Sequence, residues 1–540
     1  MGRLTRVSLA AAVVVAGAIA GTVAGRGQDT GGTVSADHFL KQYTELLRLV
    51  LDNSPQPLKA DDAVYTSLDG MLSVLDPHTN FFTPEAFNSM RERQEGSFHG
   101  IGVIISIRGG RVTVITPIEG TPAARLGLRA GDIIDAIDGQ STEDLNLDDV
   151  AHRLRGPEGT TVKVTISRPG LAAPLEVSIE RARVPSDSVR YAFLIGKDTA
   201  YIRISDFTRT TGGEVTSALE RLEKEGATRL LLDLRDNPGG IVDSAVQVAS
   251  AVLRPGQQVF STRGRTADSF QDYRASQNGP HFTGPVIVLV NRGSASASEI
   301  VAGTIQDHDR GLIVGERSFG KGVVQTVYPV QDAGLALTTA KYYTPSGRCI
   351  QRDYDSFFTY LHPVESEDNE PEATPTPAPG PVYFTDSGRK VYGGGGIGPD
   401  EVVAQGEFSE RLARLLGNSA FFHFAVTYLA DQPDKPAAAR AFDADDATLA
   451  RFKAMVIDKK WLPEKDITAA LADPTDRRDI EVSLRSEVMS AAVSLTAGYE
   501  VSIGVDTQLQ TALKLFDEAS RLYARVRDGA APQQRTAAVR

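Results

Sequence analysis

Two short runs contain residue types that can attack and cleave a peptide bond. The first, Gly-Ser-Ala-Ser-Ala-Ser-Glu at residues 293–299, lies between an apolar strand-like segment (285–290) and an amphipathic helix-like segment (300–307). A serine hydroxyl at such a turn lies beside free helix N-terminal N–H groups, which can stabilise an oxyanion. The second run, Gly-Lys-Gly-Val-Val-Gln at residues 320–325, puts a lysine before another strand-like segment (323–330). A buried lysine there would lose its charge and act as a base, so the pair indicates a hydrolase.

The serine run also fits a purely structural role. Ser296 and Glu299 have the S-x-x-E spacing of a capping box, in which the serine caps the helix and the glutamate reaches back to it. A lysine between two glycines is commonly a solvated turn residue. Each run alone therefore favours the structural role, and only their occurrence together favours catalysis.

Four longer motifs resemble peptidase family S41, the carboxyl-terminal-processing or tail-specific proteases. They lie at residues 230–240 (Leu-Leu-Leu-Asp-Leu-Arg-Asp-Asn-Pro-Gly-Gly), 290–300, 315–325 and 342–347, and the likeness covers about residues 35–405. The resemblance implies that Ser296 is the nucleophile, that Lys321 is its base and that Gln325 orients the amine. Gln325 follows Lys321 by four residues, an offset that returns to the same face of a strand.

The resemblance also implies an oxyanion hole made by the backbone N–H groups of Gly240 and Ala297, with Gly239 as the alternative to Gly240. The Asn-Pro-Gly-Gly run at residues 237–240 equally fits a simple turn between a strand (230–234) and a helix (242–253). A lysine with a reference pKa near 10.4 needs that pKa lowered by about three units to act at neutral pH, which costs about 4 kcal/mol.

Residues 97–185 resemble a PDZ domain. Phe-His-Gly-Ile-Gly-Val at 98–103 resembles its carboxylate-binding loop, and residues 122–132 and 137–139 resemble its helix-turn-strand stretch. Glycines leave backbone N–H groups free to hold a terminal carboxylate while the peptide adds as a strand. We expect protein or peptide substrates with apolar C-termini. The expected contacts are Gly100, Ile101, Gly102 and Val103, with Val150 on a helix over residues 144–154.

Length and composition limit the remaining functions. A chain of 540 residues is longer than one hydrophobic core usually supports, so several domains are expected. Its contents of 41% hydrophobic and 23% charged residues are typical of globular proteins. The net charge of −12 without a basic run argues against nucleic-acid binding as the main activity. The single cysteine, Cys349, permits no intramolecular disulfide, and the eight histidines show no metal-ligand spacing. We therefore expect no metal and no cofactor.

The first 25 residues have the pattern of an export signal. A basic start is followed by an uncharged apolar stretch at 7–24 with small-residue cleavage sites at 18–20 or 22–24. A stretch of this length could equally remain as a membrane anchor. Either outcome places the protease in the cell envelope, periplasmic or anchored.

The chain is expected to contain a mixed α/β (α+β) core of the crotonase/ClpP-like kind, an inserted PDZ domain and helical regions at both ends. An acidic, proline-rich segment is expected to be a flexible insert that interrupts the core. The expected parts are a signal or anchor (1–25), an N-terminal helical region (35–96), the PDZ domain (97–185), the protease core (186–362), the insert (363–381), a core return segment (382–405) and a C-terminal helical extension (407–530).

The function expected from these parts is that of an exported serine endopeptidase that binds C-terminal tails through its PDZ domain. The alternative is a catalytically silent PDZ adaptor or chaperone, against which Ser296, Lys321 and Gln325 together argue. An acyl-CoA enzyme is a weaker hypothesis because the PDZ domain implies a peptide substrate. In related proteases the N-terminal helical region often serves dimerisation, so a homodimer and an activating adaptor are kept as partner hypotheses.

Overall fold

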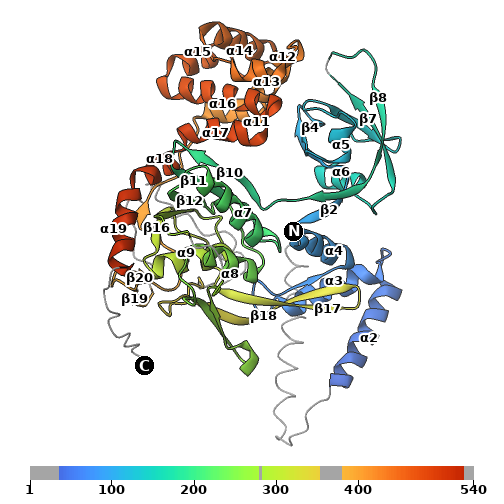
Figure 1. The fold of residues 1–540 in the computed structure, drawn as a ribbon. Coiled ribbons are helices and arrows are strands. Elements are labelled where there is room, and N and C mark those ends of the chain that lie inside the picture. The colour runs from blue at the N-terminus through green and yellow to red at the C-terminus, as the bar shows by residue number, and fades with distance from the viewer. Residues whose placement is uncertain (1–35, 169, 279–281, 353–379, 528–540) are drawn as a thin grey trace, which may run out of the picture. The chain divides into compact units, whose positions relative to one another are not determined.

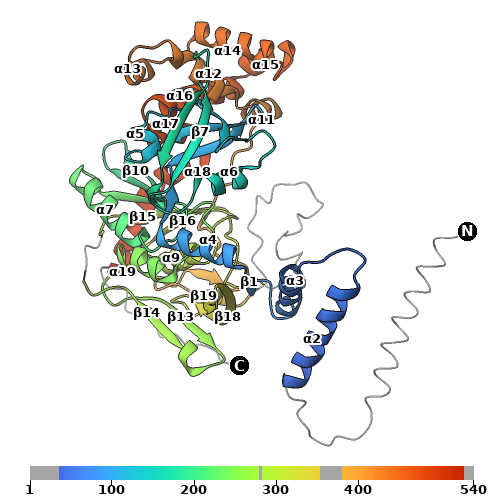
Figure 2. The ribbon, with the colours of Figure 1, turned by 90° about the vertical axis from the view of Figure 1, so that its right-hand side faces the viewer.

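The computed structural model describes residues 36–168, 170–278, 282–352 and 380–527 (Figures 1 and 2). The expected signal or anchor and most of the expected insert at 363–381 lie outside the described residues. Among the residues described, none of the helices has the length and apolar character needed to span a membrane. The chain divides into two compact units, Met1–Val74 and Leu75–Arg540.

The first unit contains the two expected N-terminal helices, α2 (Ala36–Asn53) and α3 (Ala60–Leu72). A hydrogen bond of 2.6 Å joins Tyr43 Oη and Ser67 Oγ. No residue of α2 is buried, and large apolar side chains such as Phe39 and Leu46 are 59% and 62% exposed. The large apolar residues of this helix therefore stay uncovered within the unit.

A small β-sheet domain begins after α4 (Pro84–Glu95). Its six-stranded sheet has the order β3-β4-β5-β7-β8, with β6 paired to β5, so β3 (Val103–Arg108) lies at an edge. Strands β2 (Ser97–Gly100) and β9 (Ala182–Pro185) pair where the chain enters and leaves the domain. The other elements are β4 (Arg111–Pro117), α5 (Pro122–Arg125), β5 (Ile133–Ile137), β6 (Gln140–Ser141), α6 (Leu147–Leu154), β7 (Thr161–Ser167) and β8 (Leu175–Glu180).

The largest core is built on a six-stranded sheet of order β10-β11-β12-β15-β16-β21. All neighbouring pairs are parallel except β10 with β11, as expected for alternating strands and helices. Central strands such as β15 are buried along their whole length, which explains their continuous apolar sequences. The strands are β10 (Val189–Ile195), β11 (Thr199–Ile204), β12 (Arg229–Asp233), β15 (Val286–Val290), β16 (Gly311–Gly315) and β21 (Glu401–Val402).

Helices cover both faces of this sheet. Leu230 and Leu232 of β12 point to the cluster formed with α7 (Thr211–Lys224), α8 (Val242–Ser250) and α9 (Ala297–Asp307). Leu231 points to the other face, where it joins apolar residues of α18 (Thr507–Lys514) and α19 (Phe516–Arg527). Figure 1 shows α19 in red on the side of the sheet opposite α8 and α9. The end of the C-terminal extension is thus part of the core, which the sequence did not indicate.

A second, antiparallel sheet lies beside the first and has the order β1-β18-β13-β14, with β17 also paired to β18. Figure 2 shows β13, β14 and β18 next to one another. Its strands are β1 (Asn80–Phe82), β13 (Gln258–Gly264), β14 (Gln271–Arg274), β17 (Val323–Val330) and β18 (Ala333–Tyr343), and the short helix η1 (Ala267–Ser269) lies between β13 and β14. This sheet supplies the strand that follows the expected catalytic lysine.

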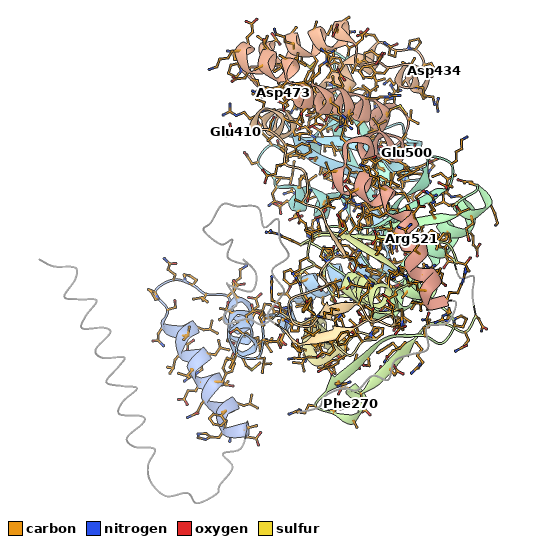
Figure 3. All side chains as sticks on the ribbon, turned by 90° about the vertical axis from the view of Figure 1, so that its left-hand side faces the viewer. Phe270, Glu410, Asp434, Asp473, Glu500 and Arg521 are labelled. Atoms are coloured by element: carbon orange, nitrogen blue, oxygen red, sulfur yellow. The ribbon has the colours of Figure 1, made fainter. Side chains whose placement is uncertain are left out.

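The rest of the extension forms a helical bundle with its own apolar cluster, which includes Phe452 and Leu484. Asp434 and Asp473 accept hydrogen bonds from the first N–H groups of two of its helices (Figure 3). The bundle helices are α11 (Glu410–Gly417), α12 (Ala420–Ala430), α13 (Lys435–Arg440), α14 (Asp446–Asp458), α15 (Glu464–Ala472) and α16 (Pro474–Ala492), after which α17 (Leu495–Ser502) and η2 (Ile503–Val505) lead to α18.

After residue 379 the described chain contacts the core again. Strands β19 (Val382–Phe384) and β20 (Lys390–Tyr392) form a hairpin. The glycine-rich segment that follows donates backbone hydrogen bonds to Ile350 O from Gly395 and Gly396, at 3.1 and 2.9 Å. The mixed α/β class, with a separate small β domain and helical regions at both ends, is confirmed.

Candidate active site

Ser296 ends the turn between β15 and α9, as the sequence predicts for a serine of this run. Its φ of +53° and ψ of −111° are seldom adopted by a residue with a side chain, so the turn holds local backbone strain. The capping alternative is present too, because the Glu299 carboxylate accepts the Ser296 N–H at 2.8 Å. That bond uses the backbone of Ser296, so it is compatible with a reactive hydroxyl.

The other two serines of the run fasten the turn to the loop that follows β12. Ser294 Oγ donates to Leu234 O at 2.8 Å and accepts the Asn291 N–H at 2.9 Å. Ser298 Oγ donates to Asn237 O at 3.0 Å, and the backbone N–H of Ala295 donates to the same carbonyl at 2.9 Å. Both hydroxyls are buried, so these serines hold the geometry of the turn and are unavailable for attack.

The Asn-Pro-Gly-Gly turn lies directly against Ser296. A Cβ placed on Gly239 would lie 2.8 Å from Ser296 Cβ and 2.9 Å from the backbone nitrogen of Ala297. The Gly239 N–H already donates to Asn237 Oδ1 at 2.9 Å. Within the described part of the chain, no hydrogen bond uses the N–H of Gly240 or of Ala297. Gly239 and Gly240 were the two candidates for the oxyanion hole. Of these, Gly240 is the one whose backbone N–H is not already used in a described hydrogen bond.

Lys321 lies in the turn before β17, and its Nζ donates to Gln325 Oε1 at 2.6 Å. Gln325 Nε2 donates in turn to the backbone carbonyl of His78. The predicted contact between Lys321 and Gln325 exists, but the alternation of a regular strand does not explain it. Lys321 precedes the strand, and a bulge at Val324 and Gln325 shifts the register of β17 on β18.

Burial is the main influence on the Lys321 amine. It lowers the pKa of Lys321 from the ordinary value, while the negative charges of Glu299 and Asp76 act in the opposite direction. The direction is the one that a neutral amine needs. The hydrogen bond to Gln325 uses one N–H of that amine and leaves its lone pair for a proton.

Glu299 joins the serine turn to the lysine turn. Its Oε2 accepts the N–H groups of Ser296 and Lys321 at 2.8 and 2.9 Å, and its Oε1 accepts the Gly320 N–H at 2.7 Å and the Ser318 hydroxyl at 2.5 Å. Burial raises the pKa of Glu299 to about 7, although these four donors oppose the shift. Two N–H groups that converge on one oxygen must lie close together. From the sequence, Glu299 was predicted only as a capping residue. Its hydrogen bonds to the lysine turn were not predicted.

A turn at residues 76–79 also belongs to the site, and the sequence analysis missed it. Asp76 accepts from the N–H groups of His78 and Thr79 at 2.8 and 2.9 Å, and from the Thr338 hydroxyl at 3.1 Å. This arrangement fixes the His78 carbonyl that receives Gln325. The Asp-Pro pair at 76 and 77 is a local turn signal, but nothing local connects it to a residue 247 positions away.

The expected peptide-binding residues lie where the chain enters β3. Gly102 has a φ of +82°, and a Cβ there would lie 2.3 Å from Thr121, so only glycine fits. Ile101 and Val150 are buried in the core of the small β domain. Gly100 ends β2 and Val103 begins β3, the edge strand. Whether these residues contact a peptide stays a prediction, and a contact by Val150 would require its helix to move, because its side chain is fully covered.

Within the described residues, no group of three or more histidine, cysteine, aspartate or glutamate side chains is arranged to hold a metal ion.

Two family models match the chain. Peptidase family S41 matches residues 198–355, and a PDZ domain matches residues 113–168, inside the expected range 97–185. The first match contains every residue expected to take part in catalysis.

The chain is also similar to named proteases. It is 41% identical over 293 residues to a carboxy-terminal-processing protease of Bartonella bacilliformis, covering 53% of this chain and 67% of that protein. It is 30% identical over 333 residues to the carboxy-terminal processing protease CtpA of Bacillus subtilis, covering 61% of this chain and 70% of that protein. Among solved structures, a photosystem II D1 C-terminal processing protease matches with 32% identity and a TM-score of 0.33, over 59% of this chain and 91% of that one.

Proposed function

The chain belongs to peptidase family S41, the carboxyl-terminal-processing serine proteases, and from this premise we propose that Ser296 and Lys321 form its catalytic dyad. One observation carries the proposal. The Lys321 amine, whose pKa is lowered by burial, is held by Gln325 on a turn that Glu299 ties to the backbone of Ser296. A lysine kept neutral beside a serine can take the hydroxyl proton.

The proposed reaction uses the groups around this pair. The Lys321 lone pair accepts the proton of Ser296 Oγ, and Oγ attacks the carbonyl carbon of the scissile peptide bond. The N–H groups of Gly240 and Ala297 donate to the resulting oxyanion. The protonated amine then gives its proton to the leaving nitrogen as the C–N bond breaks. Water next attacks the acyl-enzyme carbonyl while Lys321 accepts its proton, and that proton passes to Ser296 Oγ as the ester bond breaks and the acid product leaves.

We further propose that the PDZ domain holds the C-terminal tail of a protein substrate. The position of β3 at a sheet edge supports this, because its backbone is accessible to a strand added by a peptide. The Gly-Ile-Gly loop at residues 100–102 precedes that strand and would supply N–H groups for the terminal carboxylate. An apolar terminal residue is expected to bind best.

The direct test compares cleavage of an unstructured protein with an apolar C-terminal tail by the wild type, Ser296→Ala and Lys321→Ala. Both variants should lose at least about 10³-fold in kcat/KM. Ser217→Ala and Lys341→Ala, at exposed positions, are matched controls and should keep wild-type rates. Cleavage by Ser296→Ala at the wild-type rate would reject the dyad.

Deletion of residues 97–185 tests how the PDZ domain acts. If the domain only blocks the site until a tail arrives, the deletion variant should cleave peptides without tail selectivity. Inactivity of that variant towards every peptide would count against a purely inhibitory role.

Export and self-association are proposed on narrower grounds. The basic and apolar pattern of the first 25 residues supports export with the segment either cleaved or kept as an anchor, which N-terminal sequencing of the cell-envelope fraction would decide. The exposed apolar residues of α2 support pairing with a second copy, which the mass in solution would test.

A further inference from the structure

We infer that the C-terminal extension positions the oxyanion loop of this protease through an ion pair between Asp506 and Arg235. The inference rests on the proposed function, because it assigns the affected step to the loop that carries Gly240. Arg235 lies within the S41 match, whereas Asp506 lies outside both matched regions. The extension would thus act on the chemistry of a core that the family model describes without it.

The ion pair itself is specific in its geometry. Arg235 Nη1 donates to Asp506 Oδ1 at 3.1 Å, and Nη2 donates to Asp506 Oδ2 at 2.7 Å. Two parallel bonds between a guanidinium and a carboxylate fix orientation as well as distance. On its other side Arg235 binds the fully buried Asp233 at the end of β12, with Nη2 and Oδ2 2.6 Å apart. Arg235 is therefore held between the sheet and the extension.

Asp506 is firmly placed on its own side. It caps α18, and its Oδ1 also accepts the Leu509 N–H at 2.9 Å. Leu509 and Phe516 of α18 and α19 are buried against the sheet. The helix that Asp506 caps is consequently packed against the sheet, so the carboxylate is well placed to hold Arg235 in one position.

Hydrogen bonds continue from Arg235 to the site. The next residue, Asp236, has a φ of +58° and exchanges two bonds with the Asn291 side chain, at 2.9 and 2.8 Å. Asn237 O then accepts the Ala295 N–H at 2.9 Å, and Asn237 Oδ1 accepts the Gly239 N–H at 2.9 Å. These bonds connect the segment that carries Arg235 to both the serine turn and the Gly239–Gly240 turn.

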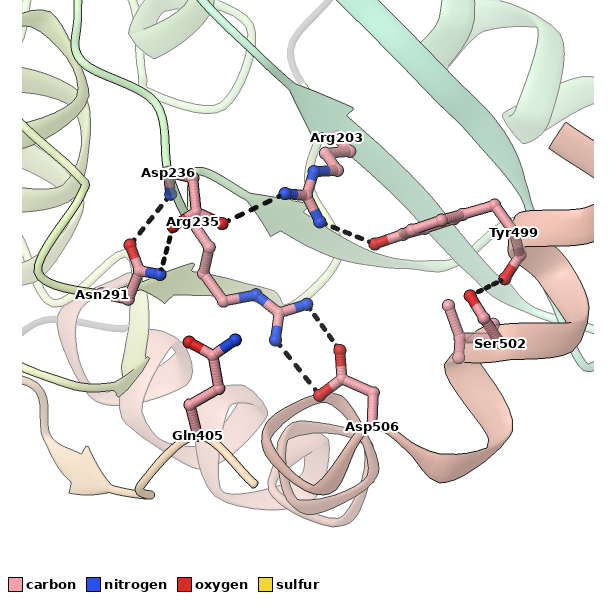
Figure 4. A pocket seen from close by; sticks show the side chains of 9 residues that line it. Arg203, Arg235, Asp236, Asn291, Gln405, Tyr499, Ser502 and Asp506 are labelled. Carbon is pink, nitrogen blue, oxygen red and sulfur yellow. Dashed lines mark hydrogen bonds and ion pairs between the residues drawn. The ribbon is translucent and has the colours of Figure 1, made fainter. Parts of the chain in front are cut away.

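A second contact between the core and the extension lies near the Arg235–Asp506 pair. Arg203 Nη1 donates to Tyr499 Oη at 2.8 Å, and Arg203 Nη2 lies 3.4 Å from Asp236 Oδ2. Between the two contacts is a cavity of about 190 Å³ whose lining includes Arg203, Arg235, Asp236, Tyr499 and Asp506 (Figure 4). Gln508 Oε1 of the extension also accepts from Arg235 Nη1, at 2.9 Å. Asp506 supplies the charged partner on this side, so loss of its charge should weaken the hold of the extension on Arg235.

The test uses the full chain with Asp506→Asn, which keeps an oxygen able to cap α18 and removes the charge. Asp506→Ser, which also caps a helix, is the second variant should the first fold poorly. The control is Asp476→Asn, because Asp476 forms a comparable pair with Arg411 inside the extension, Oδ2 and Nη2 being 2.8 Å apart. Measurements are kcat, KM, thermal midpoint and the rate at which a fluorophosphonate modifies Ser296.

We expect Asp506→Asn to lower kcat and the modification rate about tenfold with KM within about twofold, as for misplacement of a donor without its removal. Asp476→Asn should change the thermal midpoint by a similar amount and leave kcat unchanged. A wild-type kcat in Asp506→Asn, or a loss matched by the control, would overturn the inference. Failure of the probe to modify the wild type at Ser296 would instead overturn the proposed function, so the two failures are distinguishable.

Discussion

Gln325 donates a hydrogen bond through Nε2 to the backbone carbonyl of His78. A carbonyl only accepts, so this bond requires the nitrogen of the side-chain amide to face His78 and its oxygen to face Lys321. The Oε1 atom accepts from Lys321 Nζ at 2.6 Å. The turn at residues 76–79 therefore sets the orientation of the amine, although it is far from Lys321 in sequence.

This relationship predicts different outcomes for two substitutions of Gln325. Gln325→Leu removes the acceptor without adding charge, so kcat/KM should fall about 10- to 100-fold at every pH. Gln325→Glu puts a negative charge beside the amine, which favours its protonated form and raises the pKa of Lys321. Its activity should be low at neutral pH and recover as the pH rises, as a pH profile of kcat/KM would show. Parallel profiles for the two variants would contradict this assignment of Gln325.

The pH dependence of the wild type should come from the lysine and its neighbours and not from His78. Burial, reinforced by the charge of Lys321, lowers the pKa of His78 to about 4, so this imidazole is neutral between pH 5 and 9. Lys321 is active when neutral, so kcat/KM should rise with pH through an apparent pKa below the ordinary lysine value. Lys321 and Glu299 act on each other through their charges, so the apparent pKa belongs to the coupled groups. His78→Gln should keep the rising limb, and its disappearance would identify His78 as the base.

Local patterns were sufficient to predict the elements on either side of the Asn-Pro-Gly-Gly turn and the strand that follows Lys321. The strand expected at residues 230–234 is Arg229–Asp233, and the strand expected at 323–330 is Val323–Val330. The helix expected at 242–253 ends at Ser250. Apolar periodicity and glycine-containing turns act over a few residues, so a single sequence reveals them.

The parts that escaped prediction depend on contacts between distant segments. Three such contacts form only when the chain is folded. They are the hydrogen bond from Gln325 to the His78 carbonyl, the four donors that bind Glu299, and the packing of α19 against the sheet. The bulge at Val324 and Gln325 likewise depends on how β17 pairs with β18. Register and long-range pairing leave little trace in local sequence, so the right contact between Lys321 and Gln325 was predicted for the wrong reason.

Glu299→Gln should reduce activity by disturbing the link between the two turns. The carboxylate has two accepting oxygens for four donors, whereas an amide has one oxygen and would present an NH₂ group to the remaining donors. We expect a fall of about 10- to 100-fold in the rate at which a fluorophosphonate modifies Ser296. Wild-type reactivity of the Gln variant would show that the serine and lysine turns keep their places without this carboxylate.

The same variant should change how stability depends on pH. The pKa of Glu299 is raised to about 7 in the folded protein, above its unfolded value. Its contribution to stability is therefore complete below the unfolded pKa and is lost as the pH rises through about 7. Between pH 5 and 8 the wild type should lose on the order of 2–3 kcal/mol relative to Glu299→Gln, measured by urea unfolding at each pH. A constant difference between the two proteins would mean that Glu299 is already ionised in the folded protein at pH 5.

Gly239→Ala should cause a large loss of activity and only a moderate loss of stability. The residue has a φ of +98°, and a new Cβ would lie 2.8 Å from both Ala295 O and Ser296 Cβ, so the turn must move away from the serine. We expect at least about a 100-fold loss in kcat with a cost of about 1–3 kcal/mol in unfolding free energy. Gly213→Ala is the matched control, because Gly213 lies in α7 with nothing within 4 Å of a new Cβ. That control should keep full activity and gain up to about 1 kcal/mol, since alanine favours a helix. Equal activity losses in both variants would trace the effect to general destabilisation, whereas a loss confined to Gly239→Ala would locate it in the turn against Ser296.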